Sequence, residues 1–211
     1  MIIHIRMKKI LSIVMLCALM FGVQKASAET RWGVTAGVDI TTLKFNQNLM
    51  QVDQSVGYSA GLVGELMIPG IGFGVDASLL YTQRGATLHM GDQKVWASDG
   101  YGNQRSYLHY IEIPINLKFK YTNLNGVENT IAPIAFAGPD FSFLVGHNTN
   151  NALSYAGGEF GVHVGLGAEL FHKFQVTGSY GWGMSYAVKT KKLDDFSAKN
   201  KGWKIMFTYM F

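Results

Sequence analysis

Cysteine is almost absent from this chain of 211 residues, which contains only Cys17. Cys17 lies in an apolar leader, so the rest of the chain has no thiol for disulfides, thiol catalysis or cysteine-based metal sites. Long apolar runs are also missing after the leader: no window from Glu29 to Phe211 reaches the roughly 18 residues that a membrane-spanning helix needs. The sequence therefore argues against a disulfide scaffold and against a helical membrane protein.

An excess of charge is missing too. The whole chain has 18 Lys and Arg against 14 Asp and Glu. Four of these basic residues lie within positions 1–28, which contain no acid: Arg6, Lys8, Lys9 and Lys25. Without that leader the two signs balance at 14 each, because 18 minus 4 is 14. A net charge near zero argues against a nucleic-acid-binding protein.

The first 28 residues resemble a secretory signal peptide. Lys8 and Lys9 precede the apolar run Ile10–Val23, and Ala26-Ser27-Ala28 provides the small residues of a cleavage site. The apolar run is too short for a transmembrane helix. We therefore expect residues 1–28 to be removed and residues 29–211 to form a single exported domain.

The remaining sequence alternates with a period of two residues. In its last segment every second side chain is large and apolar: Trp203, Ile205, Phe207, Tyr209 and Phe211. A membrane β-strand shows this alternation over about 9 to 11 residues, because one of its faces contacts lipid. Eight such segments are predicted, at residues 32–41, 56–68, 71–84, 107–121, 131–145, 160–170, 174–188 and 203–211.

Two of these segments contain features that disturb a regular strand. In the fifth segment Ile134 and Phe136 share one parity and Phe141 has the other, with Gly138-Pro139 between them. Glycine and proline inside a strand often mark a bulge, so we predict one at Gly138-Pro139. Pro114 in the fourth segment removes a backbone donor, and we expect a local distortion there.

The connections alternate between long and short. The long ones follow the first, third, fifth and seventh segments, around residues 44–55, 85–105, 146–154 and 189–202. The short ones are Pro69-Gly70, Thr122–Asn129 and His172-Lys173. Outer-membrane barrels have short periplasmic turns and long outer loops. The pattern therefore predicts that both chain ends are periplasmic.

Alternation alone does not say which face lies inside, because a secreted barrel of the lipocalin type would invert it. The polar face is mostly Gly, Ser and Thr, whereas a water-exposed exterior carries about a quarter to a third charged residues. Small polar residues suit a narrow interior. We therefore predict an all-β protein, an eight-stranded antiparallel up-and-down transmembrane β-barrel; an ordinary β-sandwich is the alternative.

This orientation assigns two sets of residues. Aromatic side chains near the strand ends of the apolar face are expected to form interfacial girdles: Trp32, Tyr58, Tyr81, Tyr107, Tyr121, Phe174, Tyr186, Trp203 and Phe211. The inward charges are expected to pair across strands as an interior polar network: Asp39, Glu65, Asp76, Arg84, Glu112, Lys118, Lys120, Glu169 and Lys204. Eight strands leave room only for side chains, which favours a polar plug over a gated ion path.

The segment Tyr110–Lys118, with the sequence YIEIPINLK, resembles the signature strand of the PorT-type family of small outer-membrane barrels, often called porin-family proteins. Trp32–Leu43, Ala137–Pro139, Gly161–Leu170 and the aromatic end resemble the same family in the same order. The resemblance implies an integral barrel in the outer membrane of a Gram-negative envelope. The family's namesake takes part in protein secretion, whereas most similar members have no assigned activity.

Catalytic and metal motifs are weak. One class of lipopolysaccharide deacylases carries His and Ser two residues apart, but residues 29–211 contain no His-x-Ser, and the nearest match is His147 with Thr149. His163, near Glu159 and Glu169 in sequence, is interpreted as a hydrogen-bonded interior group. No two histidines have a ligand spacing. We therefore expect no enzyme activity, no metal and no cofactor.

Two predicted loops carry a possible contact surface. The connection Lys189–Lys201 is basic, so either it touches lipopolysaccharide phosphates or it is simply solvated. The connection Gly85–Arg105 contains Trp96 and Tyr101 but no recognisable ligand code. The expected partners are outer-membrane lipid, lipopolysaccharide and, through the C-terminal strand, the barrel-assembly machinery.

We expect a non-enzymatic barrel with a structural or surface-contact role through its outer loops. A component of a secretion machinery, a narrow porin-like channel and a lipid-A-modifying enzyme are the alternatives. A protein that co-purifies with the barrel, discrete conductance steps and released acyl chains would distinguish these three from the first.

Overall fold

The computed structural model describes residues 29–45, 52–89, 103–121, 130–148, 153–190 and 197–211. The expected signal peptide, Trp96 and Tyr101 of the second long connection, the turn residues 122–129 and Thr149 lie outside these ranges. Within them, no helix is both long enough and apolar enough to cross a membrane.

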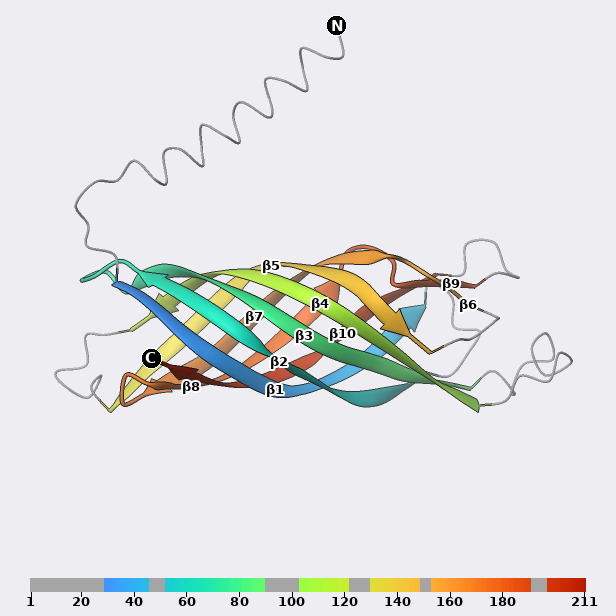
Figure 1. Ribbon diagram of the computed structural model, residues 1–211, viewed down its shortest axis with the longest axis horizontal. Coiled ribbons are helices and arrows are strands. Elements are labelled where there is room, and N and C mark those ends of the chain that lie inside the picture. Colours follow the sequence, from blue (N-terminus) through green and yellow to red (C-terminus); the bar gives the residue numbers. More distant parts are fainter. Residues whose placement is uncertain (1–28, 46–51, 90–102, 122–129, 149–152, 191–196) are drawn as a thin grey trace, which may run out of the picture.

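Eight long antiparallel strands close into a barrel (Figure 1). They are β1 Glu29–Phe45, β2 Val52–Met67, β3 Phe73–His89, β4 Asn103–Lys120, β5 Ile131–His147, β7 Gly158–Leu170, β8 Phe174–Gly183 and β10 Ser197–Met210. Each pairs with the next long strand, and β1 pairs with β10 from Gly33↔Met210 to Phe45↔Ala198. This last pairing closes the sheet, so the predicted eight-stranded barrel is confirmed.

Two short strands extend the sheet at one end of the barrel. Strand β9 (Val188–Thr190) pairs with the start of β10, and β6 (Leu153–Tyr155) pairs with β9. In Figure 1 they lie opposite the end where β1 begins and the chain finishes. We call the end with Glu29 and Phe211 the terminal end, and the end with β6 and β9 the loop end.

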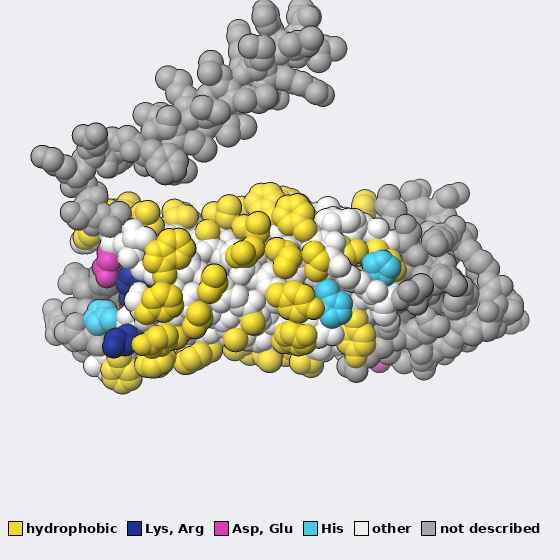
Figure 2. Space-filling view, viewed as in Figure 1, with side chains coloured by type: hydrophobic (Ala, Val, Ile, Leu, Met, Phe, Trp, Pro, Cys, Tyr) yellow, Lys and Arg dark blue, Asp and Glu magenta, His cyan; other side chains and the backbone are white. Residues whose placement is uncertain are grey.

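The outer surface of the barrel is apolar. Its exposed side chains include Trp32, Leu62, Leu117, Leu166 and Phe207. Figure 2 shows hydrophobic side chains spread over the barrel wall, with the visible Lys, Arg, Asp and Glu near its ends. Since a closed sheet satisfies its own backbone groups, such a wall suits hydrocarbon on its outside.

The fifth barrel strand differs from the prediction. Strand β5 keeps one register against β4 from Pro114↔Asp140 to Lys120↔Ile134, so the bulge predicted at Gly138-Pro139 is wrong. The register shifts instead between His109 and Tyr110 of β4, close to the loop end. Ile134 and Phe136 therefore point inward, because a barrel interior accepts apolar side chains that simple parity assigns to lipid.

Proline interrupts the ladder without moving the strands. The β3–β4 pairing is continuous up to Ala77↔Ile115 and resumes at Leu80↔Glu112, so the positions on either side of the gap keep one register. Pro114 lies in that gap, which is the local distortion expected there. Because proline has no N–H, hydrogen bonds between β3 and β4 are missing there. The pairing on both sides of the gap keeps the two strands in register.

Several strands run further toward the loop end than the alternation suggested, whereas β8 ends at Gly183 although the prediction continued it to residue 188. Strands β3 and β4 extend into the predicted connection 85–105, reaching His89 and starting at Asn103. The predicted connection 189–202 is partly strand, because β10 begins at Ser197. The sequence of these strand ends is mixed and polar and does not alternate in hydrophobicity, so a period of two does not reveal them.

Candidate functional site in the barrel interior

The interior of the barrel holds two groups of charged side chains. The first, the terminal-end cluster, has three cations and three anions: Arg31, Glu65, Asp76, Lys118, Lys120 and Glu169. The second, the loop-end cluster, has two cations and four anions: Asp39, Arg84, Glu112, Asp140, Glu159 and Lys204. Alternating inward positions on neighbouring strands bring each group together.

Glu65 of β2 is the centre of the terminal-end cluster, with a side chain that is fully buried. It forms an ion pair with Arg31 of β1. Its Oε2 lies 2.8 Å from Lys118 Nζ, and its Oε1 lies 3.1 Å from Lys120 Nζ. One carboxylate therefore faces three cations, which offsets the cost of removing its charge from water.

Glu169 ties the opposite wall into the same cluster. It accepts hydrogen bonds from Arg31 Nη2 at 2.5 Å and from Lys120 Nζ at 2.8 Å. Gln175 Nε2 of β8 donates to Glu65 Oε2 at 3.0 Å and to Glu169 Oε2 at 2.7 Å. Since these contacts link β1, β2, β4, β7 and β8, the cluster bridges the lumen rather than lining one wall.

A polar chain connects the two clusters. Asp76 of β3 lies 2.7 Å from Lys118 Nζ and accepts a 2.7 Å hydrogen bond from Asn116 Nδ2. The other end of that amide, Oδ1, lies 2.6 Å from His163 Nε2. Because an amide oxygen only accepts, this nitrogen of His163 carries a proton and donates it.

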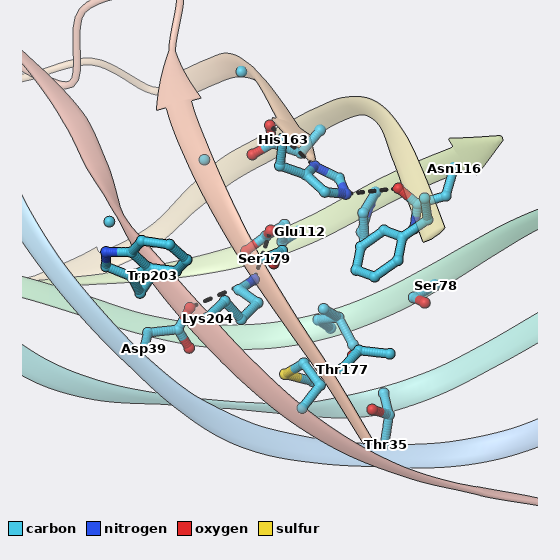
Figure 3. Close-up of a pocket in the computed structure, with 18 of the residues that line it drawn as sticks. Thr35, Asp39, Ser78, Glu112, Asn116, His163, Thr177, Ser179, Trp203 and Lys204 are labelled. Atoms are coloured by element: carbon cyan, nitrogen blue, oxygen red, sulfur yellow. Dashed lines mark hydrogen bonds and ion pairs between the residues drawn. The ribbon is translucent and has the colours of Figure 1, made fainter. Parts of the chain in front are cut away.

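In the loop-end cluster, Glu112 of β4 is well paired. Its Oε2 lies 2.6 Å from Arg84 Nη2, and its Oε1 lies 2.8 Å from Lys204 Nζ. Lys204 also lies 3.5 Å from Asp39 Oδ1. Figure 3 shows Lys204 between Asp39 and Glu112. Arg84 and Lys204 therefore form ion pairs with these two carboxylates.

Asp140 and Glu159 have weaker partners. Arg84 lies 3.9 Å from Asp140, and His163 Nδ1 lies 4.0 Å from it. Glu159 accepts hydrogen bonds from the Tyr110 hydroxyl and from Asn200 Nδ2, the latter at 2.8 Å to each oxygen. Since neither Tyr110 nor Asn200 is charged, the loop-end cluster has an excess of carboxylates.

A cavity of about 1040 Å³, which includes space open to solvent, lies beside these charges. The wall residues shown in Figure 3 include Thr35 and Thr177 as well as the charged groups. Phe136, the residue turned inward by the continuous register of β5, also lines it. Asp76, Lys118 and Gln175, whose contacts belong to the terminal-end network, also line this cavity.

The predicted interior residues are all buried or nearly so, and the structure places them in these two clusters. Three further charged members were not assigned to the network from the sequence: Arg31, Asp140 and Glu159. The neutral side chains that hydrogen-bond to the clusters were not assigned either: Tyr110, Gln175 and Asn200. Extending the parity of each segment by one or two residues would have found Arg31 and Glu159. Asp140 was hidden by the wrong bulge, because its inward parity depends on the register of β5.

The predicted girdle residues lie on the outer face. Trp32 and Phe211 lie at the terminal end, where the amide of Phe211 donates to the carbonyl of Trp32 at 2.8 Å. Trp203 lies further toward the loop end and meets Tyr180 edge to face, with ring centroids 4.9 Å apart. Tyr81 on β3 bonds through its hydroxyl to His109 Nδ1 at 2.8 Å. The other assigned girdle positions on this face are Tyr58, Tyr107, Tyr121 and Phe174. Tyr186 is exposed but lies in the segment between β8 and β9, not on a barrel strand.

Hydrogen bonds are recorded for three of the described histidines. His109 bonds to Tyr81, His147 to the carbonyl of Asn148, and His163 to Asn116. None of these three partners is a Ser or Thr hydroxyl. Within the described ranges, no group of three or more His, Cys, Asp and Glu is arranged to hold a metal ion.

Comparison with known proteins identifies a family for this chain. Residues 13–211 match the family model described as "Outer membrane protein beta-barrel domain". No curated protein matches the chain.

Solved structures of low identity are similar to this chain. Ail, the attachment invasion locus protein of Yersinia pestis, is 15% identical with a TM-score of 0.45, covering 87% of this chain and 99% of its own. Neisserial surface protein A is 11% identical with a TM-score of 0.48, covering 85% and 97%. The outer membrane enzyme PagL is 10% identical with a TM-score of 0.45, covering 82% and 97%.

Proposed function

The chain belongs to the outer membrane protein beta-barrel domain family, and from that premise we propose that it is a non-enzymatic membrane anchor with its contact surface at the loop end. The observation that carries this proposal is the terminal-end cluster. Side chains from β1, β2, β4, β7 and β8 meet across the lumen there. A lumen bridged by buried ion pairs favours a plugged barrel over a channel.

The proposed orientation has both chain ends in the periplasm and the loop end outside the cell. Glu29 and Phe211 lie at one end of the barrel, together with the short turn at residues 171–173. The strand extensions beyond the apolar wall lie at the other end. Short turns inside and longer extensions outside are typical of bacterial outer-membrane barrels. The leader that would export the chain is part of the same proposal.

Planar-bilayer recording tests the plug. The refolded barrel should give no discrete conductance steps. The double variant Glu65→Ala/Lys118→Ala removes one anion and one cation from the bridge, so it keeps the net charge while widening the lumen, and it should conduct. Steps in the unmodified barrel of the same size as in the double variant would overturn the plugged anchor and support the narrow channel.

The surface role is tested in cells. Protease added outside intact cells should cut the loop-end connections and leave the barrel wall protected. Crosslinking from the loop end should then capture an external molecule. Cleavage only after the outer membrane is opened would reverse the orientation. Co-purification with a periplasmic or secretion component would favour the secretion-machinery role, to which the PorT-type resemblance points.

An acyl-release assay tests the proposal that the barrel has no enzyme activity. Purified barrel incubated with acyl-labelled lipopolysaccharide should release no fatty acid above a heat-denatured control. The support for this expectation is local: His109, His147 and His163 are all bonded to groups other than Ser or Thr hydroxyls. Release that depends on one of these histidines would establish the lipid-A-modifying enzyme instead.

A further inference from the structure

Three lysines gather on the outside of the barrel where β1 meets β10 at the loop end. Lys44 of β1 lies directly opposite Lys199 of β10, and Lys201 lies opposite Thr42, two positions below. These positions share the outward parity of Trp203, which is 56% exposed. Side chains directly opposite on one sheet face have Cβ atoms about 4.5–5.5 Å apart, and like charges in such a pair destabilise it.

Ion pairing distinguishes these three lysines from the cations inside the barrel. Within the described ranges, no carboxylate is recorded in an ion pair with Lys44, Lys199 or Lys201. The recorded contact of Lys199 is with an aromatic ring, since its Nζ lies 5.3 Å from the ring centroid of Tyr186. Arg84 and Lys204 inside the barrel, by contrast, have carboxylates at 2.6 and 2.8 Å.

An aromatic surface lies next to the lysines, on the side toward the terminal end. Trp203 follows Lys201 by two residues, roughly 7 Å along the strand. Tyr180 contacts Trp203 on one side and Trp182 on the other, with ring centroids 4.9 Å apart in both pairs. Trp182 is 44% exposed, so it faces outward as Trp203 does. Amphipathic aromatic rings of this kind sit at the level of lipid headgroups.

Apolar side chains continue from this aromatic surface toward the terminal end. Ile205 and Phe207 follow Trp203 at outward positions of β10 and are 49% and 51% exposed. On the adjacent strand, Val38 and Val34 are exposed at the same face of β1. The seam between β1 and β10 thus has cations at one end and a hydrocarbon-compatible surface below them, as an anionic amphiphile requires.

We propose that Lys44, Lys199 and Lys201 bind the phosphate group of a phosphorylated lipid of the outer leaflet, whose acyl chains lie against Trp203 and Ile205. Three ammonium groups around one phosphate relieve the repulsion between Lys44 and Lys199 through charge-assisted hydrogen bonds. A lipid is the occupant, rather than free phosphate, because the surface below the lysines is aromatic and aliphatic. The inference rests on the proposed orientation, in which the loop end lies on the outer side of the outer membrane.

Native mass spectrometry of the barrel ejected from nanodiscs tests this site. The nanodiscs contain phosphatidylcholine with a small fraction of lipid A, either bisphosphorylated or dephosphorylated. The unmodified barrel should retain one bisphosphorylated lipid A. The triple variant Lys44→Gln/Lys199→Gln/Lys201→Gln should retain it about tenfold less, because each lysine contributes a charge-assisted contact. The triple arginine variant, which keeps the charges, should restore retention.

A matched control is Lys173→Gln, which removes an exposed lysine from the turn at the terminal end and should leave retention unchanged. Equal retention by the unmodified barrel and the triple Gln variant would overturn the site. Equal retention of dephosphorylated lipid A, or full displacement by millimolar inorganic phosphate, would overturn the lipid phosphate as its occupant. A barrel that does not insert into nanodiscs at all would instead contradict the membrane anchor itself.

Discussion

Lys120 Nζ of β4 lies 2.8 Å from Glu169 Oε2 of β7, although β5 separates these two strands in the sheet. The contact therefore spans one intervening strand on the inner face of the barrel. Arg31 of β1 reaches the same carboxylate oxygen from the other side at 2.5 Å. The proposed plug rests on this convergence of buried charges, and removal of a single charged side chain should lower the free energy of unfolding.

Glu65→Gln should strongly destabilise the barrel. The substitution leaves Lys118, Lys120 and Arg31 with one carboxylate fewer in a buried space, and breaking a buried ion pair costs about 3–5 kcal/mol. Urea unfolding in phospholipid vesicles, followed by tryptophan fluorescence, measures the loss. The exposed Glu29→Gln serves as the control and should unfold within about 0.5 kcal/mol of the unmodified protein. A Glu65 variant as stable as this control would show that the terminal-end cluster contributes little to the free energy of unfolding.

Glu159→Gln should behave differently. Glu159 belongs to the cluster with four acids and two cations, and its recorded partners Tyr110 and Asn200 are neutral. Removing its charge reduces an imbalance instead of creating one, so the change in unfolding free energy should stay within about 1 kcal/mol. The same urea titration checks it. A loss as large as that of Glu65→Gln would mean that the cations of the same cluster, Arg84 and Lys204, stabilise the charge of Glu159 directly.

Gly138→Ala should destabilise the barrel without a change in charge. A Cβ at Gly138 would meet the carbonyl oxygen of Ile115 on the neighbouring strand, so the strands would have to separate. Overpacking of this kind costs about 1–3 kcal/mol. Gly178→Ala is the matched control, because a Cβ there has no neighbour within 4 Å. Equal stability of the two variants would contradict the close approach of β4 and β5.

Tryptophan quenching by brominated lipids should locate the apolar wall. In variants that keep only Trp32 or only Trp203, bromine placed near the headgroups should quench each residue more than bromine at the chain ends. Both side chains are exposed, at 60% and 56%, so their emission should respond strongly. Emission that responds to acrylamide in water but not to lipid bromine would contradict the outward orientation of the apolar face.

Local sequence was sufficient to predict the wall of this barrel. A strand places successive side chains on opposite faces, so a period of two read along the chain separates outward residues such as Trp203 from inward ones such as Asp39. That information is present in every few consecutive residues. The number of strands and their antiparallel order followed from repeating it between short and long connections.

Tertiary structure decided what the sequence could not. The register of β5 depends on its pairing with both neighbouring strands. The meeting of Arg31 with Glu169 and the place of Lys199 opposite Lys44 depend on the pairing of β1 with β10 that closes the sheet. Closure determines which residues of distant strands lie at the same height along the barrel axis, both inside the lumen and on the outer surface where β1 meets β10. Because tilt and stagger belong to the whole barrel, no single segment contains the information that pairs those residues.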